Sequence, residues 1–303
     1  MSERNDEPQT SGELQLVSRA THLKELALRN LFLLCAFVAV IGVLLIFVFV
    51  GVRGWPAFTE IGVVKFLTGQ VWSPSTGQFG ILPMIWGTVL VMVGALALGT
   101  PLAVATAVFL AEIASPSVRQ IVRPAVELLA GIPSVIYGFF GLIILRPIVA
   151  EWSGGLGFGA LTAWFILAIM IVPTIATLSQ DAIESIPAGI REASYAMGAT
   201  TWQTIYKVLL PAAKIGIIDA IILGMGRAIG ETMAVLMVVA NAPVFPKSIF
   251  APLSTLTTAI VLDMPYAVGL HRTALFGMAI ILFIVSMLLV AAVRFLSRFG
   301  QEF

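Results

Sequence analysis

The run LFLLCAFVAVIGVLLIFVFV, from Leu31 to Val50, sets the class of fold, because it contains 20 residues without a charged side chain. An α-helix of that length spans the roughly 30 Å hydrocarbon core of a bilayer. The whole chain is also rich in apolar residues and poor in charge, since 59% of its 303 residues are hydrophobic and 11% are charged. A soluble domain carries about 25% charged residues. We therefore expect an all-α integral membrane protein.

Further apolar stretches predict about six membrane-spanning helices in total. One of them, at about Ile215–Ala242, contains Asp219, Arg227 and Glu231, which oppose insertion into a bilayer. It is counted as a span because otherwise Arg294 and Arg298 would lie outside, which weakens the bias of Lys and Arg toward one side. The remaining uncharged stretches are Pro83–Ala111, Leu128–Leu145, Ser153–Gln180 and Thr273–Val293.

The positive charges predict the orientation of the chain. With six spans the outer loops keep Arg53, Lys65, Lys247 and Arg272, and most other positive charges lie inside, as in cytoplasmic loops generally. Both termini are therefore expected in the cytoplasm, with residues 1–30 as a cytoplasmic arm and residues 31–303 as the transmembrane domain. In the outer loop, Ser248–Leu262 is apolar enough either to lie at the membrane interface or to dip back into the protein.

Several other classes of function find no support in the sequence. The net charge of +1 gives no clustered basic face for nucleic acid. His22 and His271 have no Cys or carboxylate cluster nearby and are interpreted as loop histidines, not as metal ligands or general bases. The sequence lacks a G-x-x-x-x-G-K-[ST] loop, which cradles nucleotide phosphates. We expect a protein that is not an enzyme and has no cofactor of its own.

Residues 181–211, here named the coupling segment, are predicted to form two short cytoplasmic helices. Gly198 stands where a helix end often needs a left-handed residue. Thr200 and Gln203 form a capping-box pattern at the start of a second helix, Trp202–Leu209. Pro211 would stop this helix. Five apolar residues recur at helical spacing and give the first helix one apolar face: Ile183, Ile186, Ile190, Ala193 and Met197.

Periodicity alone fits two roles for the coupling segment, a helix pair resting at the membrane interface or a docking site for another protein. The residue identities favour docking, because the segment resembles the EAA signature of ABC-importer permeases. The matching residues are Glu192, Ala193, Ser194, Gly198 and Pro211, with Ser194 in place of the second Ala. The resemblance implies coupling to a separate ATPase subunit, and that subunit would bind the ATP and magnesium.

The charged residues of the range 215–242 form the candidate translocation site. Arg227 lies near the middle of the span, where burial of a guanidinium costs at least about 2.5–3.5 kcal/mol. Glu231 follows four residues later, so on a continuous helix the two side chains share one face and can pair or bind a common guest. Gly226 and Gly230 form a small-xxx-small pattern that lets another helix approach.

Two interpretations of Arg227 and Glu231 follow. The two residues form either a structural ion pair between helices or an anion-handling site. The second is considered because ionisable residues inside the membrane are functional candidates by default. A guanidinium offers paired donors to an oxyanion. A carboxylate beside it can accept the proton that phosphate carries at neutral pH and sulfate lacks.

Four segments together resemble the PstC-type permease of the phosphate-specific ABC importer. They are Phe79–Pro83, Glu127–Gly138, the coupling segment and GRAIGETMAVLMV at Gly226–Val238. The resemblance, which runs from about Phe79 to the C-terminus, implies the type I importer permease fold in the bacterial plasma (inner) membrane. It also implies phosphate as the cargo, and a PstA-type permease, a PstB-type ATPase dimer and a PstS-type phosphate-binding protein as partners. The alternatives are an ABC permease for molybdate or sulfate, and a proton-coupled secondary anion transporter.

Overall fold

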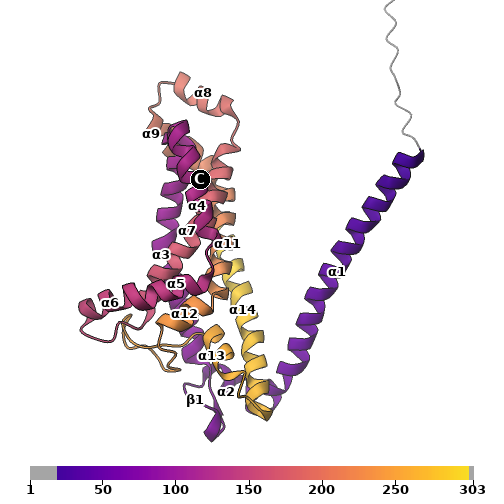
Figure 1. Cartoon of the computed structure of the whole chain (residues 1–303), viewed down its shortest axis with the longest axis vertical. Coiled ribbons are helices and arrows are strands. Elements are labelled where there is room, and N and C mark those ends of the chain that lie inside the picture. The colour runs from indigo at the N-terminus through magenta and orange to yellow at the C-terminus, as the bar shows by residue number, and fades with distance from the viewer. Residues whose placement is uncertain (1–18, 300–303) are drawn as a thin grey trace, which may run out of the picture. The chain divides into compact units, whose positions relative to one another are not determined.

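The structure, a computed structural model, describes residues 19–299 (Figure 1). Residues up to Phe49 and residues from Val50 onward form two separate compact units. The first unit holds most of α1 (Arg19–Ala57), whose described side chains before Val50 are exposed. An apolar helix without a buried face is suited to lipid or to another protein. Residues 19–30 of the predicted arm are the start of this helix, and residues 1–18 lie outside the described part.

Long helices that pack side by side build the second unit (Figure 1). They are α3 (Leu82–Val108), α7 (Ala160–Glu184), α11 (Lys214–Gly230) and α14 (Gly269–Phe299). Helix α7 packs on both α3 and α11, and α11 also packs on α14. At Gly94 the approach is so close that a Cβ atom would lie 2.0 Å from the Trp164 ring. The Trp164 Nε1–H donates to the Leu90 carbonyl at 2.9 Å, which fixes the ring against α3.

The described residues contain five helical stretches that are long and apolar enough to cross a membrane, and a bent pair of helices makes up to six. The pair joins Thr201–Ala212 to Lys214–Gly230 at an angle of 69°. About six transmembrane helices were predicted, and this is confirmed. The five unbroken stretches are Lys24–Thr68, Leu82–Ile113, Ser134–Ser153, Ala160–Glu184 and Gly269–Phe295.

The third predicted span, Leu128–Leu145, has the wrong boundaries. Helix α4 (Pro116–Gly131) ends inside it, and the backbone is extended at Ile132, where ψ is 129°. Pro133 causes this break, because proline disfavours helical geometry in the residue before it and has no N–H to donate. The apolar span is instead Ser134–Ser153, formed by α5 (Ser134–Phe140), a π-helical turn (Gly141–Leu145) and α6 (Arg146–Ser153).

The fifth predicted span, about Ile215–Ala242, is also broken. Helix α11 ends at Gly230, and Glu231 is extended with a ψ of 122°. A short helix, α12 (Met233–Val238), then begins. Helices α12 and α5 pack on each other so closely that a Cβ atom at Gly138 would lie 2.7 Å from the Met237 sulfur. The two broken spans therefore meet beside α7.

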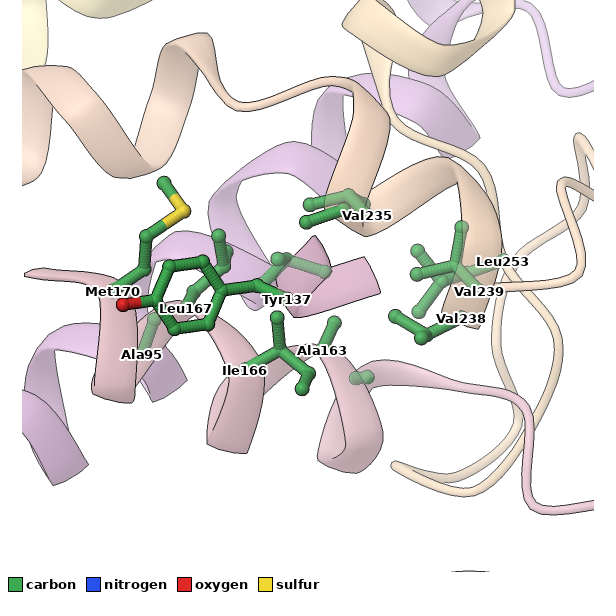
Figure 2. Close-up of a cluster of buried hydrophobic side chains, with 13 residues drawn as sticks. Ala95, Tyr137, Ala163, Ile166, Leu167, Met170, Val235, Val238, Val239 and Leu253 are labelled. Atoms are coloured by element: carbon green, nitrogen blue, oxygen red, sulfur yellow. The ribbon is translucent and has the colours of Figure 1, made fainter. Parts of the chain in front are cut away.

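A buried apolar cluster surrounds this meeting point (Figure 2). Tyr137 from α5, Ile166 from α7 and Val235 from α12 all contribute side chains to it. The Tyr137 hydroxyl donates to the Leu129 carbonyl at 2.7 Å. That carbonyl belongs to the last turn of α4 and also accepts from the Ile132 N–H at 3.3 Å. The cluster thus holds the ends of both breaks in place.

The two segments that were predicted as outer loops contain helices and short strands. Residues 51–82 contain the end of α1, a π-helical turn (Phe58–Gly62), α2 (Val63–Thr68), a 3-10 turn (Pro74–Thr76) and the strands β1 (Trp72–Ser73) and β2 (Gln78–Phe79), which pair antiparallel. The segment 248–262 dips back into the protein, since it contains the start of α13 (Leu256–Asp263) and Leu256 is fully buried. The Leu256 N–H donates to Thr88 Oγ1 of α3 at 3.0 Å.

The two histidines are not in loops, contrary to the sequence interpretation. His22 lies in α1 and His271 in α14. His271 Nε2 lies 3.2 Å from Asp263 Oδ2, and the Trp72 Nε1–H donates to the same oxygen at 2.8 Å. His271 therefore helps to join the β1–β2 hairpin to α13 and α14.

Candidate translocation and coupling sites

Arg227 lies on α11 and joins three helices. Its Nη1 donates to Thr174 Oγ1 of α7 at 3.0 Å, and its Nη2 donates to the Ala130 carbonyl of α4 at 3.4 Å. The Ala130 carbonyl lies in the last turn of α4 and has no intrahelical partner. Arg227 thus supplies a donor to the end of one broken span from a position close to the other break.

Glu231 does not share a helix face with Arg227, because α11 ends at Gly230. Its Oε1 accepts from the Ala234 N–H at 3.0 Å, in the first turn of α12. A carboxylate is favoured there, because the first amides of a helix have no intrahelical acceptor and carry partial positive charge. The described residues show no ion pair between Glu231 and Arg227. The prediction of a pair on one helix face is therefore wrong.

The glycines of α11 divide into two sets. Gly216 and Gly224 face α7, where a Cβ atom would lie 2.5 Å from Ala182 Cβ and 2.5 Å from Ile175 Cγ1. Gly226 and Gly230 have nothing within 4 Å of such an atom. No described part of this chain therefore uses the predicted small-xxx-small pattern of Gly226 and Gly230 for helix packing.

A groove runs along the exposed side of α11. Its volume is about 830 Å³, and it includes Gly226 and Arg227 at one end and Asp219 at the other. Thr174 of α7 and Arg294 of α14 complete the polar lining. Asp219 and Arg294 were not predicted as site residues. The spacing of eight between Asp219 and Arg227 could have indicated Asp219, since residues four and eight apart share a helix face.

The coupling segment has the predicted helix–turn–helix form. Helix α8 (Ala188–Ala196) precedes Gly198, which has a left-handed φ of 81°. Thr200 and Gln203 form both hydrogen bonds of a capping box at α9 (Thr201–Thr204). A π-helical turn (Ile205–Leu209) and α10 (Leu210–Ala212) follow. Pro211 lies in the first turn of α10 and does not stop the helix, which ends at Ala212, three residues after the predicted Leu209.

The predicted apolar face does not lie on one helix, because Ile183 belongs to α7, Ile186 precedes α8 and Met197 follows it. Ile183 and Ile186 lie in the core, whereas Met197 is 89% exposed. Trp202 and Tyr206 of the following turns are each 66% exposed. Exposed aromatic and Met side chains in one segment are typical of protein contacts.

The EAA-like residues lie on this exposed segment. Glu192, Ala193 and Gly198 are exposed. Ser194 is partly buried, and its Oγ lies 2.9 Å from Thr204 Oγ1, which joins α8 to α9. The small side chain at position 194 therefore has a structural role within the segment.

Arg191 anchors the coupling segment and was not predicted as a site residue. Its Nε and Nη2 donate to Glu112 Oε1 at 3.0 and 2.9 Å. Its Nη1 and Nη2 also donate to the carbonyls of Ile186 and Ile183 at 2.7 and 2.8 Å. Glu112 belongs to a π-helical turn (Phe109–Ile113) that continues α3. The coupling segment is thus attached to α3 as well as to α7.

These features define a multi-pass membrane permease, with a charged groove beside the break that ends α11 and an exposed segment at one end of the bundle. The chain belongs to the family of binding-protein-dependent transport system inner membrane components, which it matches over residues 99–299. This membership replaces the alternative of a secondary transporter. It also agrees with the predicted location in an inner membrane.

Several relatives are similar to this chain over most of its length. The probable ABC transporter permease protein YqgH of Bacillus subtilis is 40% identical over 301 residues, which cover 97% of both chains. The phosphate transport system permease protein PstC of Mesorhizobium japonicum is 38% identical over 263 residues and 80% of both chains. PstC of Haemophilus influenzae is 32% identical over 292 residues, with 90% of this chain and 91% of the relative covered.

Solved structures support the ABC importer permease fold. A bacterial alginate ABC transporter, in complex with an alginate pentasaccharide-bound periplasmic protein, matches with a TM-score of 0.63 and 20% identity over 90% of this chain and 96% of that chain. The inward-facing methionine ABC transporter MetNI matches with a TM-score of 0.52 and 24% identity, covering 69% and 93%.

Proposed function

We propose that this chain is a permease subunit of an ATP-driven importer of inorganic phosphate. The PstC relatives carry a phosphate transport name and are up to 38% identical over 80% of the chain. The observation that carries the proposal is the position of Arg227, a guanidinium that lines an open groove beside a break in a transmembrane span. Helical backbone is broken at membrane depth where it lines a cavity or lies inside protein.

Arg227 is the proposed contact for phosphate. A guanidinium presents paired donors that match the oxygens of a phosphate group. In this chain those donors point to Thr174 and to the Ala130 carbonyl, which phosphate oxygens would replace as acceptors. Gly226 and Gly230 leave the surrounding surface open. Glu231, which holds the start of α12, is the proposed acceptor for the proton of phosphate.

The coupling segment is the proposed contact with a separate ATPase dimer of the PstB type, which would bind ATP and magnesium. Its exposed Met197 and Trp202 supply apolar surface, and Glu192 and Ala193 lie beside them on the exposed α8. A PstA-type permease would cover the open face of α11, and a PstS-type protein would deliver phosphate from outside. Both termini, with residues 1–30, then lie in the cytoplasm.

The test is reconstitution of the purified complex in proteoliposomes. Uptake of radiolabelled phosphate, driven by ATP and loaded binding protein, is expected for the wild type. Arg227→Gln should abolish uptake without lowering the amount of complex, whereas Arg227→Lys, which keeps the charge but not the paired donors, should keep only a part of it.

Competing oxyanions separate the cargo alternatives. An excess of unlabelled phosphate should prevent uptake, and equal amounts of sulfate or molybdate should not. ATP-driven uptake of sulfate or molybdate in place of phosphate would contradict the proposed cargo while leaving the class of transporter intact.

A further inference from the structure

The groove along α11 holds a second guanidinium that the proposed function does not use. Arg294 of α14 lines it together with Asp219. Asp219 is eight residues before Arg227, which corresponds to about 12 Å along a helix. Asp219 also lies close to Lys214, where α11 begins after the coupling segment. The groove thus has one guanidinium beside the break in the span and another at the coupling-segment end.

The contact between Arg294 and Asp219 is long and exposed. Arg294 Nη2 lies 4.0 Å from Asp219 Oδ1, and their side chains are 67% and 60% exposed. Exposed ion pairs of this kind contribute little to stability and are easily exchanged. Inorganic phosphate and phosphate monoesters bear more negative charge than one carboxylate and can take both ends of a guanidinium fork. Such a group therefore competes with Asp219 for the Arg294 guanidinium.

We propose that Arg294 and Asp219 form a second oxyanion site, selective for a phosphate group, at the coupling-segment end of the groove. Arg294 donates to two phosphate oxygens, and the Asp219 carboxylate accepts the P–OH proton of a phosphate that still carries one. The inference rests on the proposed function for one source of this group, inorganic phosphate leaving the groove. The other source with the same chemistry is the headgroup of phosphatidic acid, a phosphate monoester that also carries a P–OH group.

An exit site for free phosphate has a measurable consequence. Phosphate that accumulates on the coupling-segment side occupies the site, and the next ion leaves the groove more slowly. Uptake should therefore be inhibited by inorganic phosphate inside proteoliposomes. The inhibition should depend on Arg294 and Asp219, because loss of a charged hydrogen-bond donor or acceptor weakens binding by about tenfold or more.

The first experiment measures initial uptake by the reconstituted complex at increasing internal phosphate. Arg294→Gln and Asp219→Asn are expected to raise the internal phosphate concentration for half-inhibition at least about tenfold. The control is Arg123→Gln, because Arg123 lies outside the groove and pairs with Glu127 and Asp181. This control should keep the wild-type inhibition.

The second experiment tests the lipid source, with phosphatidic acid as the probe. Native mass spectrometry of the delipidated complex should count one fewer bound phosphatidic acid in Arg294→Gln than in the wild type if a headgroup fills the site. A change in either experiment supports a phosphate-group site and names its source. If Arg294→Gln changes neither, the proposal is wrong. A wild-type complex that transports no phosphate would instead contradict the proposed function, and the lipid measurement would still test the site.

Discussion

Arg191 and Glu112 form the most enclosed ion pair among the described residues, with side chains that are 21% and 9% exposed. Two guanidinium nitrogens share one carboxylate oxygen, and the rest of the guanidinium closes the turn between α7 and α8. Movement of α8 is thereby linked to the end of α3. Removal of one member of such a pair leaves a charge with little access to water.

The first prediction concerns this anchor. Glu112→Gln keeps the shape of the side chain but removes its charge, and we expect a loss of about 1–3 kcal/mol in stability. We also expect ATP hydrolysis by the complex to respond less to loaded binding protein. Arg123→Gln is the matched control, because the exposed Arg123 cluster should contribute only about 0–1 kcal/mol. Unchanged stimulation in Glu112→Gln would show that the pair has no part in coupling.

The second prediction concerns the turn after α8. Gly198 and Gly189 both have open space where a Cβ atom would lie, but only Gly198 has a positive φ, of 81°. Gly198→Ala should cost about 1–2 kcal/mol through backbone strain, whereas Gly189→Ala should be neutral or slightly stabilising within a helix. Hydrogen exchange of the coupling segment measures this difference. Equal protection in the two variants would contradict the strain argument.

The third prediction concerns Arg227 and Glu231, which contact different groups. If they formed an ion pair, the double variant Arg227→Gln with Glu231→Gln would transport better than either single variant, because lone buried charges are costly. Since Glu231 holds α12 and Arg227 contacts Thr174 and Ala130, we expect no recovery in the double variant. Phosphate uptake, normalised to complex abundance, is the measurement. Uptake near the wild-type rate in the double variant would restore the ion-pair interpretation.

The fourth prediction concerns close packing of α3 on α7. Gly94→Ala places a methyl group within 2.0 Å of the Trp164 ring and should cost about 1–3 kcal/mol. Gly226→Ala is the control, since nothing lies within 4 Å of its Cβ position. Thermal unfolding in detergent should show a lower Tm for Gly94→Ala alone. A wild-type Tm for Gly94→Ala would mean that the Trp164 ring moves freely.

The sequence predicted features that depend on local patterns. The apolar run Leu31–Val50 indicated a span, and the Thr200–Gln203 capping box and the left-handed Gly198 were placed correctly. Each of these depends on residues within a few positions of one another, and the physical preference of those residues is nearly independent of the rest of the chain.

Features that depend on tertiary packing were missed. Glu231 has good helix propensity, so its identity does not predict that α11 ends at Gly230. The break is stabilised by the Ala234 amide and by packing of α12 on α5. Arg191 finds its partner Glu112 79 residues away, and no spacing rule indicates such a pair. The site residues could be chosen from the sequence, but their partners could not.

The break at Glu231 has a consequence for biogenesis. The last carbonyls of α11 lack intrahelical donors, and the hydroxyls of Thr232 and Thr257 reach the carbonyls of Gly230 and Glu231 at the long distances of 3.3 and 3.5 Å. Unsatisfied backbone groups cost several kcal/mol each in hydrocarbon, and Gly230 is exposed. In a newly inserted copy that has not yet bound its partner subunit, these backbone carbonyls therefore face lipid and draw water into the membrane. Such orphan copies should be the ones that membrane quality control retains or degrades.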